Sequence, residues 1–113
     1  MFWNSQGYKH LYSFLDEINS PFEILCLCET WLLHPVDLPF TLKNNYNIHF
    51  CPAIKERSHG RAKGGLAIIY KNYYKMLVLD TSPWWIICLL SHKKLTFGIC
   101  FVYFNLPDKY YLL

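Results

Sequence analysis

The sequence is most informative between residues 24 and 32, which read Ile-Leu-Cys-Leu-Cys-Glu-Thr-Trp-Leu. The apolar run from Ile24 to Cys28 has the length of a buried strand, and it stops at one carboxylate, Glu29. A buried strand is rigid, so the first polar side chain after it is held in a fixed place. In open α/β sheets, ligands gather at this carboxyl end of the strands. Glu29 is therefore a candidate ligand for Mg²⁺.

The composition indicates one domain with more apolar surface than it can cover. The 113 residues are 53% hydrophobic and 19% aromatic but only 17% charged, where a typical soluble domain has about a quarter charged residues. A chain of this length buries a real core. Either the chain packs very densely or it carries apolar surface that something else covers, and the low share of charged residues favours the second reading.

Cysteine usage suits a reducing, intracellular compartment. The chain has five cysteines, an odd number, and four of them lie inside apolar runs: Cys26, Cys28, Cys88 and Cys100. Such thiols behave as small hydrophobic side chains rather than as a disulfide framework.

Neither a signal peptide nor a membrane span is expected. Residues 1–11 lack an apolar core behind a basic start. The apolar segment from Trp84 to Phe104 is divided by Ser-His-Lys-Lys at residues 91–94, and each half is far shorter than the ~20 residues that cross a bilayer as a helix. A β-hairpin explains this segment better.

The apolar periodicity predicts one early helix followed by strands. Residues 8–18 carry apolar side chains at helical spacing, and this helix would connect the strands 2–4 and 24–28, which should then run parallel. One turn of helix is expected between residues 30 and 45. Further strands are expected at 46–51, 66–70, 75–79, 84–90 and 95–104. The pattern predicts an α+β fold, a mixed sheet with the helix on one apolar face and nothing to cover the other.

Taken together, these segments resemble the endonuclease/exonuclease/phosphatase superfamily, in particular the apurinic/apyrimidinic-type endonuclease domain of LINE-like non-LTR retrotransposons. The resemblance rests on motifs that follow one another in the family's order across nearly the whole chain. They are Asn4 after a strand, the Glu-Thr-Trp-Leu box at 29–32, Gly-Gly-Leu-Ala-Ile-Ile-Tyr at 64–70, Phe-Gly-Ile-Cys-Phe-Val-Tyr at 97–103 and Asn-Leu-Pro at 105–107.

The resemblance implies a four-layer αββα sandwich that hydrolyses DNA phosphodiester bonds with Mg²⁺. Glu29 would be the metal ligand, Asn4 a polar residue that orients the phosphate or its neighbours, and Tyr103 an active-site tyrosine. The family also requires a later Gly-Asp-x-Asn box and a closing Asp-His pair, and neither occurs in these 113 residues. The likeness therefore covers the amino-terminal half of the family domain, and we expect residues 1–113 to form a single, partial, truncated domain.

The net charge of +3 can be assigned to one segment. Lys55, Arg57, Arg61 and Lys63 outweigh Glu56 there, and the remaining charges cancel. This segment could contact DNA phosphates weakly and without sequence preference, or it could be a solvated loop.

The sequence thus predicts a transposon-derived endonuclease-like domain that is inactive or nearly so, because the nucleophile-orienting and general-base residues of the family are missing. Three alternatives stay open. The chain could be a protein-interaction module that uses its exposed apolar sheet, or a nuclease that is completed when two copies self-associate through that sheet. It could also be the product of a non-functional open reading frame.

Overall fold

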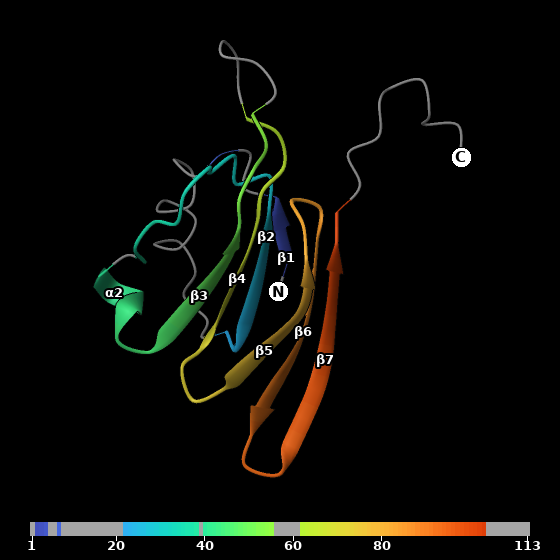
Figure 1. Cartoon of the computed structure of the whole chain (residues 1–113). Helices are drawn as coiled ribbons and strands as arrows, with labels where there is room; N and C mark the ends of the chain where they lie inside the picture. Colours follow the sequence, from blue (N-terminus) through green and yellow to red (C-terminus); the bar gives the residue numbers. More distant parts are fainter. Residues whose placement is uncertain (1, 5–6, 8–21, 39, 56–61, 104–113) are drawn as a thin grey trace.

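The computed structural model describes residues 2–4, 7, 22–38, 40–55 and 62–103. These residues form strands and one four-residue helix, connected by short turns and loops (Figure 1). The elements are β1 (Phe2–Asn4), β2 (Ile24–Cys28), α2 (Phe40–Lys43), β3 (Tyr46–Cys51), β4 (Leu66–Lys71), β5 (Lys75–Thr81), β6 (Trp85–His92) and β7 (Leu95–Val102).

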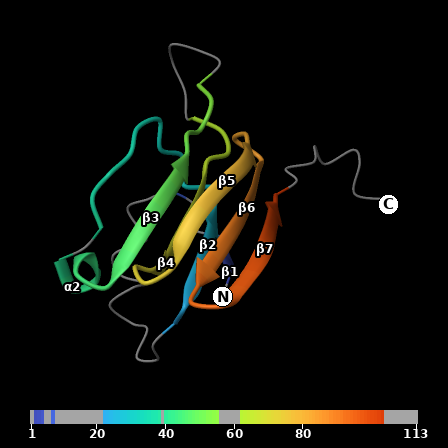
Figure 2. The same ribbon diagram turned by 60° about the horizontal axis from the view of Figure 1, so that its bottom comes forward.

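The strands form two sheets. The first has the order β1-β2-β4-β3, in which β1 runs parallel to β2 and the other neighbours are antiparallel. The second has the order β5-β6-β7 and is antiparallel throughout, with a bulge in β5 between Val78 and Asp80. Figures 1 and 2 show the second sheet lying across one face of the first.

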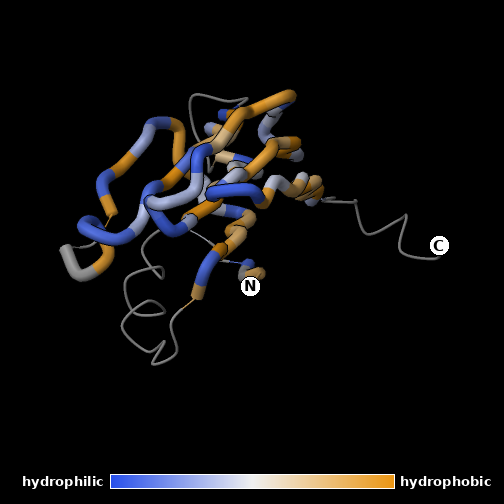
Figure 3. The backbone as a smooth tube through the Cα atoms, turned by 90° about the horizontal axis from the view of Figure 1, so that it is seen from below, coloured by the Kyte–Doolittle hydropathy of each residue, from blue (hydrophilic) through white to orange (hydrophobic). Residues whose placement is uncertain are grey.

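The first sheet is apolar on both faces. In β4, the alternate residues Leu66, Ile68 and Tyr70 face the second sheet, whereas Ala67 and Ile69 face the opposite side. The two faces differ because successive side chains of a strand point in opposite directions. An uninterrupted apolar run is the pattern of a strand covered on both faces, and hydrophobic segments run through both layers in Figure 3.

The main core lies between the two sheets. Cys28, Leu66 and Ile68 from the first sheet pack in one cluster with side chains of the second, including the fully buried Ile86 and Leu90. The second sheet leaves its other face largely in solvent, where Leu77 and Leu79 of β5 are 60% and 56% exposed.

The prediction of an α+β fold, half of an αββα sandwich with one mixed sheet and a main helix, is wrong for the described residues. Their regular structure is almost all strand, with α2 as the one short helix among the described residues, and the strands form two sheets instead of one. Burial explains the difference, since stacking the sheets lets the apolar side chains of β4 and β6 cover each other. The helix expected at residues 8–18 lies outside the described residues.

Several local predictions are confirmed. β1, β2 and β3 have the expected bounds, β1 and β2 are parallel, and the one turn of helix is α2. The expected β-hairpin in the apolar segment that begins at Trp84 is formed by β6 and β7. Within the described ranges, no helix has the length and apolar character needed to cross a membrane.

Candidate functional site

Three of the predicted site residues lie at one edge of the molecule. β1, β2 and β7 point the same way in Figure 1, so Asn4, Glu29 and Tyr103 stand at the carboxyl ends of these strands. β4 runs antiparallel to β2 and therefore begins at the same edge, with Gly64 and Gly65 just before it. The site thus combines segments from both sheets.

The backbone turns sharply where β2 ends. Glu29 and Trp31 both adopt left-handed backbone conformations, with φ values of 55° and 59°. Residues other than glycine rarely adopt this conformation. Backbone hydrogen bonds hold this turn. Gly7 N donates to Glu29 O at 2.8 Å, Thr30 N donates to Gly65 O at 3.2 Å, and Trp31 N donates to Gly64 O at 3.0 Å. Glu29 is therefore held from two sides by its own and its neighbours' backbone.

The close approach of β4 to this turn requires glycine. Gly65 has a φ of 90°, and a Cβ atom built on it would lie 2.4 Å from Oγ1 of the buried Thr30. Gly64 has a φ of 73°, and its Cβ would lie 2.9 Å from the Trp84 ring. Both residues combine a positive φ with a lack of space for a side chain, the two conditions that favour glycine. The glycine pair thus sets the position of the turn that carries Glu29.

Tyr103 joins the second sheet to Glu29. Its backbone N donates to Trp84 O at 2.8 Å, which extends the β6–β7 ladder by one residue pair. Its side-chain hydroxyl donates a short hydrogen bond to Oε1 of Glu29 in a partly buried setting. A hydrogen bond to a carboxylate is stronger than one between neutral groups, and it fixes the direction of the acceptor. Tyr103 and Glu29 are 74 residues apart in the sequence, so only the folded chain brings them together.

Asn4 lies beside this pair. It is half-buried, and its register partner in β2 is Cys28, the residue before Glu29. A carboxylate and an amide oxygen are ligand types that Mg²⁺ accepts, and proteins commonly hold this ion through one or two carboxylates together with substrate phosphates. Among the described residues, no three His, Cys, Asp or Glu side chains gather into a metal-binding group. Glu29 and Asn4 thus offer oxygen donors of these two types at this edge.

The basic segment is only partly described. Lys55 and Lys63 are exposed, and Lys63 forms an isolated bridge with Ile54, the neighbour of Lys55, through two backbone hydrogen bonds of 2.9 and 2.7 Å. The bridge brings both ends of the segment together. Arg57 and Arg61 lie outside the described residues, so their predicted contact with DNA stays a prediction.

The thiols beside the site are poor nucleophiles and poor metal ligands. Burial raises the pKa of Cys26 to about 11. Burial, followed by the charge of Glu29, raises the pKa of Cys28 to about 12. Since the thiolate is the reactive and metal-binding form, both side chains act as part of the core between the sheets, as the sequence predicted. Cys100 differs from that prediction because it is exposed on β7.

Sequence reasoning missed a second pair of the same type at the other end of β2. Glu23, just before the strand, accepts a short hydrogen bond from the exposed Tyr73 hydroxyl, and this carboxylate raises the pKa of Tyr73 above its usual range. No local signal could have revealed it, because the two residues are far apart in sequence. The Glu23–Tyr73 pair is a useful internal reference for the Glu29–Tyr103 pair.

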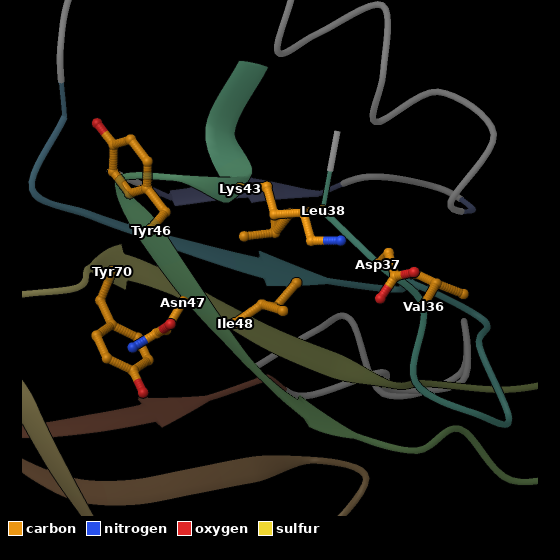
Figure 4. Close-up of a pocket in the computed structure, with 8 residues that line it drawn as sticks. All are labelled: Val36, Asp37, Leu38, Lys43, Tyr46, Asn47, Ile48 and Tyr70. Carbon is orange, nitrogen blue, oxygen red and sulfur yellow. The ribbon is translucent and has the colours of Figure 1, made fainter. Parts of the chain in front are cut away.

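A hollow of about 420 Å³ lies beside β3, away from these residues (Figure 4). Its lining includes Asp37, Lys43 and Asn47, and the Lys43 side chain points toward Asp37 in Figure 4. Its size is within the range of ligand pockets. The hollow includes none of the predicted site residues.

Comparison with known proteins adds no relative. No protein-family model matches the chain, and a search of curated proteins finds no match.

Proposed function

We propose that this chain is an endonuclease-like domain that holds Mg²⁺ together with a DNA phosphate at the edge where Asn4, Glu29 and Tyr103 lie. We also propose that the chain by itself has little or no nicking activity. The observation that carries the proposal is the hydrogen bond between Tyr103 and Glu29. It holds the Glu29 carboxylate next to Tyr103, and Asn4 is the register partner of Cys28, the residue before Glu29. The resemblance in the order of the motifs supports the same assignment.

Each residue has a distinct task in this proposal. Glu29 supplies a hard oxygen ligand, and the Tyr103 hydroxyl holds the carboxylate in one orientation. The Asn4 amide can hydrogen-bond to a phosphate oxygen. When bound, Mg²⁺ would polarise the phosphoryl group and stabilise the leaving oxygen.

The expectation of low turnover rests on the groups that are missing from the described residues. A positioned general base contributes typically ~10²–10⁴-fold to a reaction rate. Within the described residues, Glu29 is not joined by two further acidic, histidine or cysteine side chains. The site can therefore bind and orient a phosphate more readily than it can activate water.

Two measurements test the proposal, and the Glu23–Tyr73 pair provides their matched controls. The first is Mg²⁺ binding by calorimetry in the presence of a short DNA duplex. We expect Glu29→Gln to abolish metal binding, Tyr103→Phe to weaken it, and Glu23→Gln and Tyr73→Phe to leave it unchanged. Equal binding in Glu29→Gln and Glu23→Gln would remove the basis of the proposal.

The second measurement is nicking of supercoiled plasmid with and without Mg²⁺. We expect the wild-type chain to show no nicking above the level of Glu29→Gln. Metal-dependent nicking that disappears in Glu29→Gln but persists in Glu23→Gln would show a working site and contradict the expected inactivity. Both outcomes require that the variants keep the wild-type circular dichroism spectrum.

One observation favours a second candidate function, that of a protein-interaction module. The second sheet exposes three large apolar side chains, Leu77, Leu79 and Trp85, and exposed apolar surface commonly marks an interaction site. This function would be independent of the carboxylate. Binding to a protein partner should therefore persist in Glu29→Gln and be lost in Leu77→Lys. Metal binding should be lost in Glu29→Gln and persist in Leu77→Lys.

A further inference from the structure

The four outer strands of the two sheets differ in how well their edges are protected. Natural proteins protect such edges by short strands, charges, prolines and bulges. β1 has three residues, β3 runs directly into Pro52, and β5 contains a bulge together with Lys75 and Asp80. β7 has eight residues, Leu-Thr-Phe-Gly-Ile-Cys-Phe-Val, with no charge and no proline, and its register with β6 is regular throughout.

The ladder between β6 and β7 shows which backbone groups face the free edge. Tyr103 N donates to Trp84 O, and these two residues continue the register of the strand pair. In an antiparallel pair, hydrogen-bonded and non-hydrogen-bonded residue pairs alternate. The odd-numbered residues of β7 therefore bond to β6, and the N–H and C=O groups of the even-numbered residues point away from it. The residues with outward groups are Thr96, Gly98, Cys100 and Val102.

The side chains of these four residues leave the edge accessible. All four residues are exposed, whereas Phe97, Ile99 and Phe101 are half-buried or buried. The four are also small, and a Cβ on Gly98 would meet only Leu89 and Cys88 of β6 within 4 Å. Among the described residues, β7 pairs with β6 alone. A further strand could approach along the whole length of β7.

We propose that β7 pairs with β7 of a second copy of this chain, antiparallel and across a twofold axis that passes through Ile99. In this register Thr96 faces Val102 of the second copy and Gly98 faces its Cys100, so every outward N–H and C=O finds a partner. Each of the hydrogen-bonded pairs exchanges two bonds. A twofold dimer with self-complementary surfaces is the commonest form of homo-oligomer.

The chemistry of the strand fits a second copy of this chain. β7 carries no charge that its own copy would repel, and its outward-facing residues are small and uncharged, so two copies can approach along the whole register. The two three-stranded sheets would become one sheet of six strands. Directly opposed residues lie on the same face of an antiparallel sheet, so the apolar outer faces with Leu77 and Leu79 would become continuous. This inference does not depend on the proposed function.

Sedimentation equilibrium over a concentration series tests the pairing. We expect the apparent mass of the wild-type chain to rise from 13.5 kDa to twice that value. Gly98→Pro should stay monomeric, because proline removes an N–H that faces the free edge and none that faces β6. Cys100→Lys provides a second route to the same result, since it places like charges close to the axis.

Leu77→Lys is the matched control, because it adds the same charge to the same outer face but on β5. It should dimerise as the wild type does. A wild-type chain that stays monomeric at all concentrations would overturn the proposal. So would loss of the dimer in Leu77→Lys but not in Gly98→Pro and Cys100→Lys, because the outer face and not the edge would then carry the association.

Amide hydrogen exchange gives a residue-by-residue readout of the same dimer. In dilute solution the amides of Phe97, Ile99 and Phe101 should be protected, while those of Gly98 and Cys100 should exchange freely. At high concentration Gly98 and Cys100 should become protected as well. Unchanged exchange at these two residues in a sample that sediments as a dimer would also overturn the β7 pairing.

Discussion

Replacing Gly65 by alanine should destabilise the fold and disturb the candidate site together. The substitution adds one Cβ atom at a φ of 90°, 2.4 Å from Thr30 Oγ1 and 3.2 Å from Ala53 Cβ. A left-handed backbone costs an L-residue about 1–2 kcal/mol, and overpacking a core site typically costs about 1–3 kcal/mol. We therefore expect a loss of about 2–5 kcal/mol in the free energy of unfolding.

Urea denaturation followed by tryptophan fluorescence measures this loss, since the chain has four tryptophans. The shift in midpoint at constant slope gives the change in stability. Gly98→Ala is the matched control because its added Cβ would lie 3.6 Å from the nearest atom, an ordinary contact. In a strand interior this change should be neutral or stabilising by up to ~1 kcal/mol.

The clash with Thr30 also predicts a functional consequence. Thr30 follows Glu29 directly, so a shift of the turn should move the Glu29 carboxylate away from the Tyr103 hydroxyl. Gly65→Ala should then weaken Mg²⁺ binding even under conditions where the protein is fully folded. The reasoning would be refuted if Gly65→Ala and Gly98→Ala were equally stable, because the close approach of β4 to the turn would then be absent.

Three further predictions concern the core, the histidine in β3 and the thiols. Ile68→Ala should cost about 2–5 kcal/mol in urea denaturation, because Ile68 is fully buried between the sheets; a loss under ~1 kcal/mol would contradict the two-layer core. Burial lowers the pKa of His49 from its ordinary 6.5. As the pH drops, the unfolded chain therefore takes up a proton before the folded chain does, and the free energy of unfolding should fall below pH 6.5. His49→Gln should reduce this pH dependence in thermal melts. An aromatic disulfide reagent should label Cys100 quickly and Cys26 and Cys28 only after denaturation, since Cys100 is exposed and burial keeps the other two protonated; rapid labelling of more than one thiol would contradict this.

The strands could be predicted because their signal is local. Each apolar run has a definite length and ends at a turn residue or a charge, and β2, β3 and β4 begin where the sequence places them. The arrangement of the strands in two sheets could not be predicted in the same way. Uninterrupted apolar runs such as Trp84–Leu90 show that a strand needs cover on both faces, but they do not show which other strand supplies it.

The candidate site was only partly predictable for the same reason. Glu29 could be identified as the first polar residue after a buried strand, and Gly64-Gly65 could be recognised as a glycine pair just before the next apolar strand. That Gly65 lies against Thr30 was not visible, because this contact depends on the antiparallel register of β2 and β4.

The sequence by itself determined the strands, the place of Cys26 and Cys28 in the apolar packing, and the position of one carboxylate at the end of β2. Only the tertiary structure decided that the strands stack as two layers, that Tyr103 reaches Glu29, and that β7 pairs with β6 alone among the described residues. The physical reason is the range of the forces involved. Side-chain alternation and turn preferences depend on neighbouring residues in the sequence. Burial and hydrogen bonding across sheets depend on residues that only the folded chain brings together.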